Sequence, residues 1–130
     1  RQNNSGTYSY FREAVLGKAR DYKLGSIDQS GSKDVVALVS KTPGAIGYSG
    51  MGYATSEVKM LRISKKKGEQ GVAPTVENAM SGAYPITRPL HIYTLGDPEG
   101  VIAEYLAWMM SEEGQAVVSE LGYIPADNNE

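Results

Sequence analysis

The residues of this chain that could do chemistry gather at its start. They are a guanidinium at Arg1, hydroxyls at Ser5 and Thr7, and a glycine backbone at Gly6 that a ligand can approach closely. Ser5 or Thr7 can cap a helix that we expect to begin near Thr7, because apolar residues then recur at helical spacing. The first N–H groups of a helix lack intrahelical partners and lie at the positive end of its dipole. This start therefore predicts a site for a phosphate-like anion.

No acidic side chain neutralises the predicted helix start. A capping box would need Glu or Gln three residues after the cap, but Tyr8 and Tyr10 occupy those positions, and the first acidic residue is Glu13. Arg1 stands ahead of the loop, where its guanidinium could form a bidentate pair with an oxyanion. The motif is short, and Ser-Gly-Thr equally suits a plain cap on a surface helix. Both interpretations stay open at this level.

Composition excludes several classes of site. The chain has 130 residues, of which 41% are hydrophobic, which is enough for one modest domain with a core. A net charge of −2 gives no general attraction to nucleic acid, so we expect no nucleic-acid partner. There is no cysteine, and the single histidine, His91, cannot form a zinc cluster. We therefore expect neither a metal site nor a cofactor.

The sequence lacks the motifs of catalysis. Its glycines at positions 47, 50 and 52 do not form the dinucleotide-binding pattern, and no P-loop occurs. Ser49 lies in Gly47-Tyr48-Ser49-Gly50-Met51, where a serine hydrolase would need glycine at the last position. No nucleophile is accompanied by a base and an orienting group. We expect a binding protein and not an enzyme, with no catalytic residues.

The remaining elements are expected to hold the anion loop in place. A helix is predicted from near Ser32 to residues 42–44, and a short one is predicted between its cap at Thr75 and Gly82. A small buried strand and a glycine-dense turn are predicted within residues 44–54, which we place beside the anion loop. Residues 58–63 and 90–95 are also predicted as strands. The lysine-rich turn at residues 64–71 is expected to face water.

The final third of the chain is predicted to be helical. One helix, over about residues 101–110, is apolar around most of its circumference and must be buried or partnered. A second begins at Ser111 and ends at Gly122. No apolar run approaches the roughly 20 residues needed to span a bilayer. The chain begins at Arg1 without the strand that usually precedes an anion loop, so we expect further sequence upstream.

Several short blocks of sequence, taken together, are similar to one protein family. They are Arg1 with Ser5-Gly6-Thr7 and Phe11, residues 42–48, residues 84–90, Glu113-Gly114-Gln115, and Gly122-Tyr123-Ile124-Pro125. In this order and spacing they resemble the C-terminal portion of the phosphate-binding proteins of bacterial phosphate ABC transporters. The resemblance covers nearly the whole chain.

This resemblance implies an α/β fold of the type II periplasmic-binding-protein class, incomplete relative to the two-lobe family fold. Residues 1–87 would form a second-lobe-like anion-binding region. Residues 88–130 would supply the C-terminal strand and helices that return to the first lobe in the family. The resemblance also implies a periplasmic or extracellular location, a membrane permease as transport partner, and any membrane anchor in a missing N-terminus.

The family's ligand is inorganic phosphate, and the resemblance implies that Arg1, Asn3, Ser5, Gly6 and Thr7 bind it. Asn3 departs from the pattern, because many relatives carry there an acidic residue that accepts a proton from phosphate and pairs with the arginine. An amide is neutral and can donate as well as accept a hydrogen bond. We expect Asn3 to relax the discrimination against fully ionised oxyanions such as sulfate.

Two functional classes remain open from the sequence. The first is a phosphate-capturing module of an uptake receptor, whose C-terminal third packs on the missing N-terminal lobe. The second is a truncated structural or interaction module that binds anion weakly and self-associates. In that case a second copy would cover the C-terminal third, as a homodimer with or without exchange of the C-terminal helices.

Overall fold

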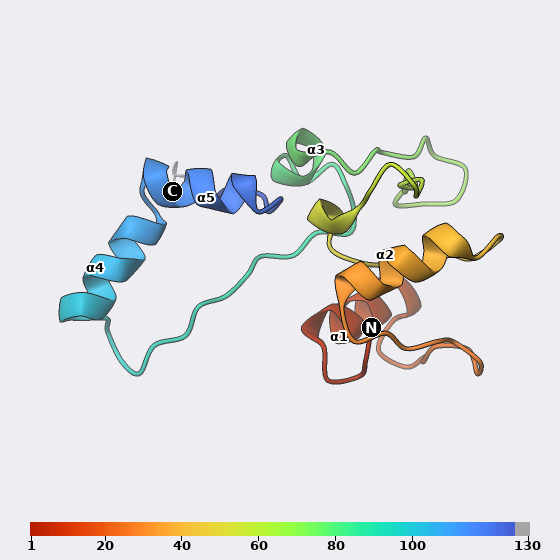
Figure 1. The fold of residues 1–130 in the computed structure, drawn as a ribbon, viewed down its shortest axis with the longest axis horizontal. Coiled ribbons are helices and arrows are strands. Elements are labelled where there is room, and N and C mark those ends of the chain that lie inside the picture. The colour runs from red at the N-terminus through yellow and green to blue at the C-terminus, as the bar shows by residue number, and fades with distance from the viewer. Residues whose placement is uncertain (127–130) are drawn as a thin grey trace. The chain divides into compact units, whose positions relative to one another are not determined.

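The computed structural model describes residues 1–126, which form helices joined by long irregular segments (Figure 1). The chain divides into two compact units, Arg1–Leu61 and Arg62–Glu130. The helical elements in chain order are α1 Gly6–Phe11, a π-helix Arg12–Leu16, α2 Ser32–Lys41, a 3-10 helix Met51–Tyr53, α3 Val76–Met80, α4 Gly100–Met109 and α5 Glu112–Glu120. Over residues 1–126, none of these helices combines the length and the apolar character that a membrane span requires.

The first helix begins where the sequence predicts it, and Ser5 is its cap. The Ser5 backbone is extended, and its hydroxyl oxygen accepts a hydrogen bond of 3.2 Å from the N–H of Thr7. The π-helix follows α1 directly and ends at Gly17, whose N–H donates to the carbonyl of Arg12 at 3.1 Å. Gly17 has a φ of 81°, which favours glycine and stops the helix. Residues 6–16 are therefore helical without a break.

The second predicted helix, α2, is confirmed from Ser32 to Lys41. Its residue Val35 is buried, and the loop that follows the helix folds back against it. A Cβ atom at Gly47 would lie 2.9 Å from methyl groups of both Val35 and Val39, so this contact requires glycine. The loop thereby brings Tyr48 against Phe11, the last residue of α1.

The three predicted strands are wrong for the described part of the chain. Residues 44–48, 58–63 and 90–95 belong to no strand, and Ile46 in the first of them is 79% exposed instead of buried. Ile63 and Val72 form an isolated antiparallel bridge, with N–H···O distances of 3.0 and 2.8 Å, at the base of the exposed lysine turn. Alternating side chains predict an extended backbone, but a strand needs a second strand to accept its hydrogen bonds. Apart from the single bridge at Ile63, these segments have no partner strand within residues 1–126.

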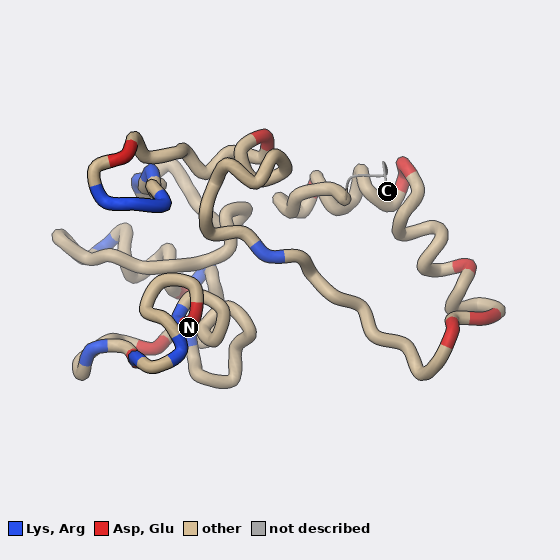
Figure 2. The backbone as a smooth tube through the Cα atoms, turned by 180° about the vertical axis from the view of Figure 1, so that it is seen from behind, with Lys and Arg blue, Asp and Glu red and all other residues tan. Residues whose placement is uncertain are grey.

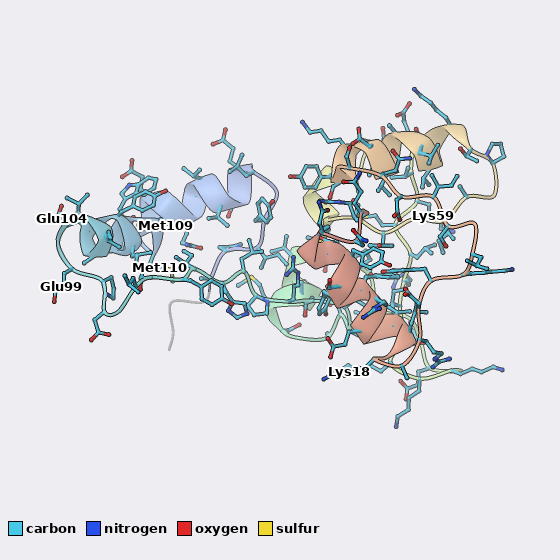
Figure 3. The ribbon with its side chains drawn as sticks, turned by 90° about the horizontal axis from the view of Figure 1, so that it is seen from below. Lys18, Lys59, Glu99, Glu104, Met109 and Met110 are labelled. Carbon is cyan, nitrogen blue, oxygen red and sulfur yellow. The ribbon has the colours of Figure 1, made fainter. Side chains whose placement is uncertain are left out.

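The helices of the second unit are confirmed. The hydroxyl oxygen of Thr75 caps α3 by accepting from the N–H of Asn78 at 3.2 Å, and that of Ser111 caps α5 by accepting from Gly114 at 3.3 Å. The predicted apolar helix is α4; Figure 3 marks its cap residue Glu99, and Glu104 and Met109 on the helix itself. Its Val101 and Ile102 are 79% and 57% exposed. The described chain does not bury this helix.

Charge is distributed unevenly along the chain (Figure 2). All 13 lysine and arginine residues lie at or before Arg88. The sequence after Arg88 contains Asp and Glu residues but no lysine or arginine. The small net charge of −2 is therefore the sum of a basic segment up to Arg88 and an acidic segment after it. The predicted anion loop lies in the basic segment.

Candidate functional site

Backbone and side-chain hydrogen bonds tie the N-terminal loop to the start of α2. Nη1 of Arg1 donates to the hydroxyl oxygen of Ser32 at 3.0 Å, and the N–H of Gln2 donates to the carbonyl of Gln29 at 3.1 Å. The N–H of Ser5 donates to the carbonyl of Gln2 at 3.0 Å, which closes a tight turn ahead of α1. The loop therefore has a defined path between two helix starts.

The predicted site residues lie along this loop. Arg1, Ser5 and Thr7 are half-buried, and Gly6 is the first residue of α1. Asn3 lies in the turn between Gln2 and Ser5 and is exposed. The hydroxyls of Ser5 and Thr7 thus lie at the start of α1, whereas the guanidinium of Arg1 reaches Ser32 at the start of α2.

The starts of α1 and α2 differ in charge. In α2, the carboxylate of Asp34 turns back and accepts hydrogen bonds from the N–H of Gly31 at 2.9 Å and the hydroxyl of Ser30 at 2.8 Å. The first turn of α1 contains no acidic residue. The Asp34 carboxylate therefore compensates the positive end of the α2 dipole, whereas the start of α1 carries no compensating negative charge.

Arg1 has a donor that the described chain leaves unsatisfied. Its Nε atom is shielded from water and has no hydrogen-bond partner among the described residues, although Nη1 is bound to Ser32. Nε of Arg12 is in the same condition, while its Nη1 lies 3.6 Å from a carboxylate oxygen of Asp21. A buried unpaired donor of a charged group is costly, so the region has more donors than acceptors. An anion is the kind of ligand that would restore the balance.

Four aromatic rings pack in series between α1 and the loops that follow it, and two of their three contacts are stacked. The ring of Tyr8 lies 4.7 Å from that of Tyr22, which lies 5.7 Å from that of Tyr48, and Tyr48 stacks on Phe11 at 4.1 Å. Burial, followed by a hydrogen bond with Tyr22, raises the pKa of Tyr48 well above its ordinary value. Removal from water, and then the nearby Asp21 carboxylate, raises the pKa of Tyr8. These phenols stay neutral and act as packing groups, not as acids.

Sequence reasoning missed Ser32. It is the buried polar residue of the described chain, at 8% exposure, and it holds Arg1 across 31 positions of sequence. The sequence predicted only that a helix begins near this residue, because the pairing with Arg1 depends on the fold. His91, which was set aside as a site residue, lies 6.3 Å from the ring of Tyr93. Residues 1–126 contain no cluster of three His, Asp or Glu side chains suited to a metal.

The chain is similar to known proteins over most of its length. The family model described as PBP superfamily domain matches residues 1–113. Phosphate-binding protein PstS of Pseudomonas aeruginosa is 40% identical over 129 residues, which cover 96% of this chain and 40% of the relative. Phosphate-binding protein PstS 2 of Streptococcus agalactiae is 35% identical over 137 residues, covering 98% and 45%. Phosphate-binding protein PstS of Bacillus subtilis is 35% identical over 127 residues, covering 96% and 40%. The chain spans less than half the length of these relatives.

Proposed function

This chain belongs to the PBP superfamily, and on that premise we propose that it binds inorganic phosphate or a related oxyanion as part of a receptor for phosphate uptake. The relatives named phosphate-binding protein support the ligand class. Since these relatives bear the names of binding proteins and the sequence lacks a catalytic group, we assign the chain no enzymatic role.

Two observations carry the proposal: the uncompensated start of α1, and an unsatisfied donor on the guanidinium that begins the loop leading into it. The first turn of α1 has no acidic residue, whereas the start of α2 is closed by Asp34. Arg1 is held next to this loop by Ser32 and has a spare N–H at Nε. A tetrahedral oxyanion supplies several acceptors at once, which suits a group of donors of this kind.

Within this proposal each site residue has a separate role. Arg1 supplies positive charge and a bidentate fork, and Gly6 supplies a backbone N–H at the helix start. The hydroxyls of Ser5 and Thr7 donate to anion oxygens, and the Ser5 oxygen continues to cap the helix. Asn3, at the exposed side of the turn, gives a neutral contact that tolerates sulfate as well as phosphate.

We further propose that the chain contributes an α/β second lobe of a type II binding protein. Residues 1–87 form the anion-binding region, and residues 88–130 form the segment that returns to the first lobe, of which residues 127–130 lie outside the described part. Residues 90–95, which lack a strand partner here, would pair with strands of that lobe. The full receptor would work in the periplasm or outside the cell, with any anchor ahead of Arg1, and would deliver phosphate to a membrane permease.

The alternative is a structural module that self-associates and binds anion weakly. It is favoured by the exposed apolar side chains of α4, including Val101 at 79% and Tyr105 at 59%. In that case a second copy would cover the helix, in a plain or helix-exchanged homodimer.

Calorimetric titration of the 130-residue chain with phosphate and with sulfate tests the proposal. We expect saturable one-site binding of both anions, weaker than in a receptor that encloses its ligand from two sides. Titration with chloride at matched ionic strength is the control for general charge screening. Heats of phosphate addition indistinguishable from those of chloride would contradict the proposed function and leave the structural module.

A further inference from the structure

We propose that Ser32 is a positioning residue that orients the Arg1 guanidinium for the anion. The inference rests on the proposed function and adds a residue from a different helix to its site. Ser32 opens α2, while the other site residues lie on the loop and at the start of α1. Its hydroxyl oxygen accepts a hydrogen bond of 3.0 Å from Nη1 of Arg1.

The burial of Ser32 limits the partners that its hydroxyl can bind. Ser32 is 8% exposed, so its hydroxyl has little access to water and depends on protein or ligand partners. A serine oxygen can accept a bond from the guanidinium and still donate its own hydrogen to a further acceptor. Since Arg side chains have several rotatable bonds, one fixed N–H restricts the plane in which the remaining donors lie.

The unsatisfied Nε of Arg1 supports the same inference independently of the burial of Ser32. Ser32 accepts from one end of the guanidinium, and the described residues offer nothing to Nε. A side chain that is anchored at one nitrogen and short of acceptors at another is prepared to receive an oxyanion.

Ser30 offers a matched control at the same helix start. Its hydroxyl donates to the Asp34 carboxylate at 2.8 Å and therefore serves the cap of α2, with no bond to Arg1. Ser30 and Ser32 flank Gly31, the cap residue of α2. Only the loss at position 32 removes the bond to the guanidinium.

The test compares the phosphate affinity of Ser32→Thr, Ser32→Val and Ser30→Ala with that of the unmodified 130-residue chain. Thr and Val have nearly the same shape, but only Thr keeps the oxygen. We expect Ser32→Val to weaken binding about 10-fold, as for loss of a bond to a charged group. Ser32→Thr and Ser30→Ala should stay within about 3-fold of the unmodified chain.

A second comparison separates orientation of Arg1 from a general effect on folding. In an Arg1→Lys background the Thr and Val variants at position 32 should bind phosphate equally, because the planar fork that Ser32 orients is gone. Equal affinities of the two variants in the unmodified background would overturn this inference alone. No phosphate binding by the unmodified chain would overturn the proposed function and this inference with it.

Discussion

The rings of Phe11 and Tyr48 lie 4.1 Å apart and are parallel to within 5°. Phe11 is the last residue of α1, and Tyr48 follows Gly47, whose backbone lies directly against α2. This one stack therefore links the helix that begins at the anion loop to the helix that carries Ser32. Loops that hold functional groups need such rigid support, because small shifts of a binding group lower affinity.

The raised pKa of Tyr48 predicts a pH dependence of stability. Its neutral form is favoured in the folded chain, so its contribution is fully present below the ordinary value of 10.0 and is lost as the pH rises through the folded value. We expect the urea midpoint to fall between about pH 9 and about pH 11, and the fall to be smaller in Tyr48→Phe. Tyr93→Phe, at a phenol that is 87% exposed, should leave the slope unchanged. Identical slopes in Tyr48→Phe and the unmodified chain would contradict this prediction.

Replacement of Thr7 by alanine should weaken phosphate binding. The change removes one hydroxyl donor beside the helix start, and the expected loss is on the order of 1–3 kcal/mol if the bond reaches a charged ligand. Isothermal calorimetry measures the effect. The matched control is Thr75→Ala, which removes a threonine that caps α3 in the other unit. A Thr7→Ala titration that matches both the control and the unmodified chain would exclude Thr7 from the site.

Gly114→Ala should destabilise the junction of α4 and α5. A Cβ at this buried glycine would lie 2.6 Å from the carbonyl oxygen of Met109 and against that of Trp108. Backbone atoms cannot turn aside as a side chain can, so we expect a loss of about 2 kcal/mol or more. Thermal unfolding followed by Trp108 fluorescence reports on this unit. The exposed substitution Ser119→Ala on α5 is the control, and equal melting of the two variants would refute the steric argument.

The exposed face of α4 predicts association of the isolated 130-residue chain. Several large apolar side chains between Val101 and Trp108 are each at least 41% exposed. Their exposure favours burial against a partner. Light scattering should give a mass above the monomer value of 14.0 kDa, and Ile102→Glu should lower it. Ser119→Glu adds the same charge outside this face and should not. A cooperatively folded monomer at low concentration would contradict the need for a partner.

Much of the local structure could be predicted from the sequence. The caps at Ser5, Thr75 and Ser111 and the glycines that end helices act over a few residues, so their effect is readable without the fold. The absence of an acidic residue near Ser5 is likewise a property of the sequence, and it led directly to the candidate anion site.

The tertiary structure decided what depends on distant partners. Strands at residues 58–63 and 90–95 were predicted from alternation, but hydrogen-bonded pairing requires another strand, and the described chain supplies none. The pairing of Arg1 with Ser32 and the stack of Phe11 on Tyr48 also join residues far apart in sequence. No local pattern specifies such contacts, because they form only when loops and helices pack, and packing is decided by shape and burial over the whole unit.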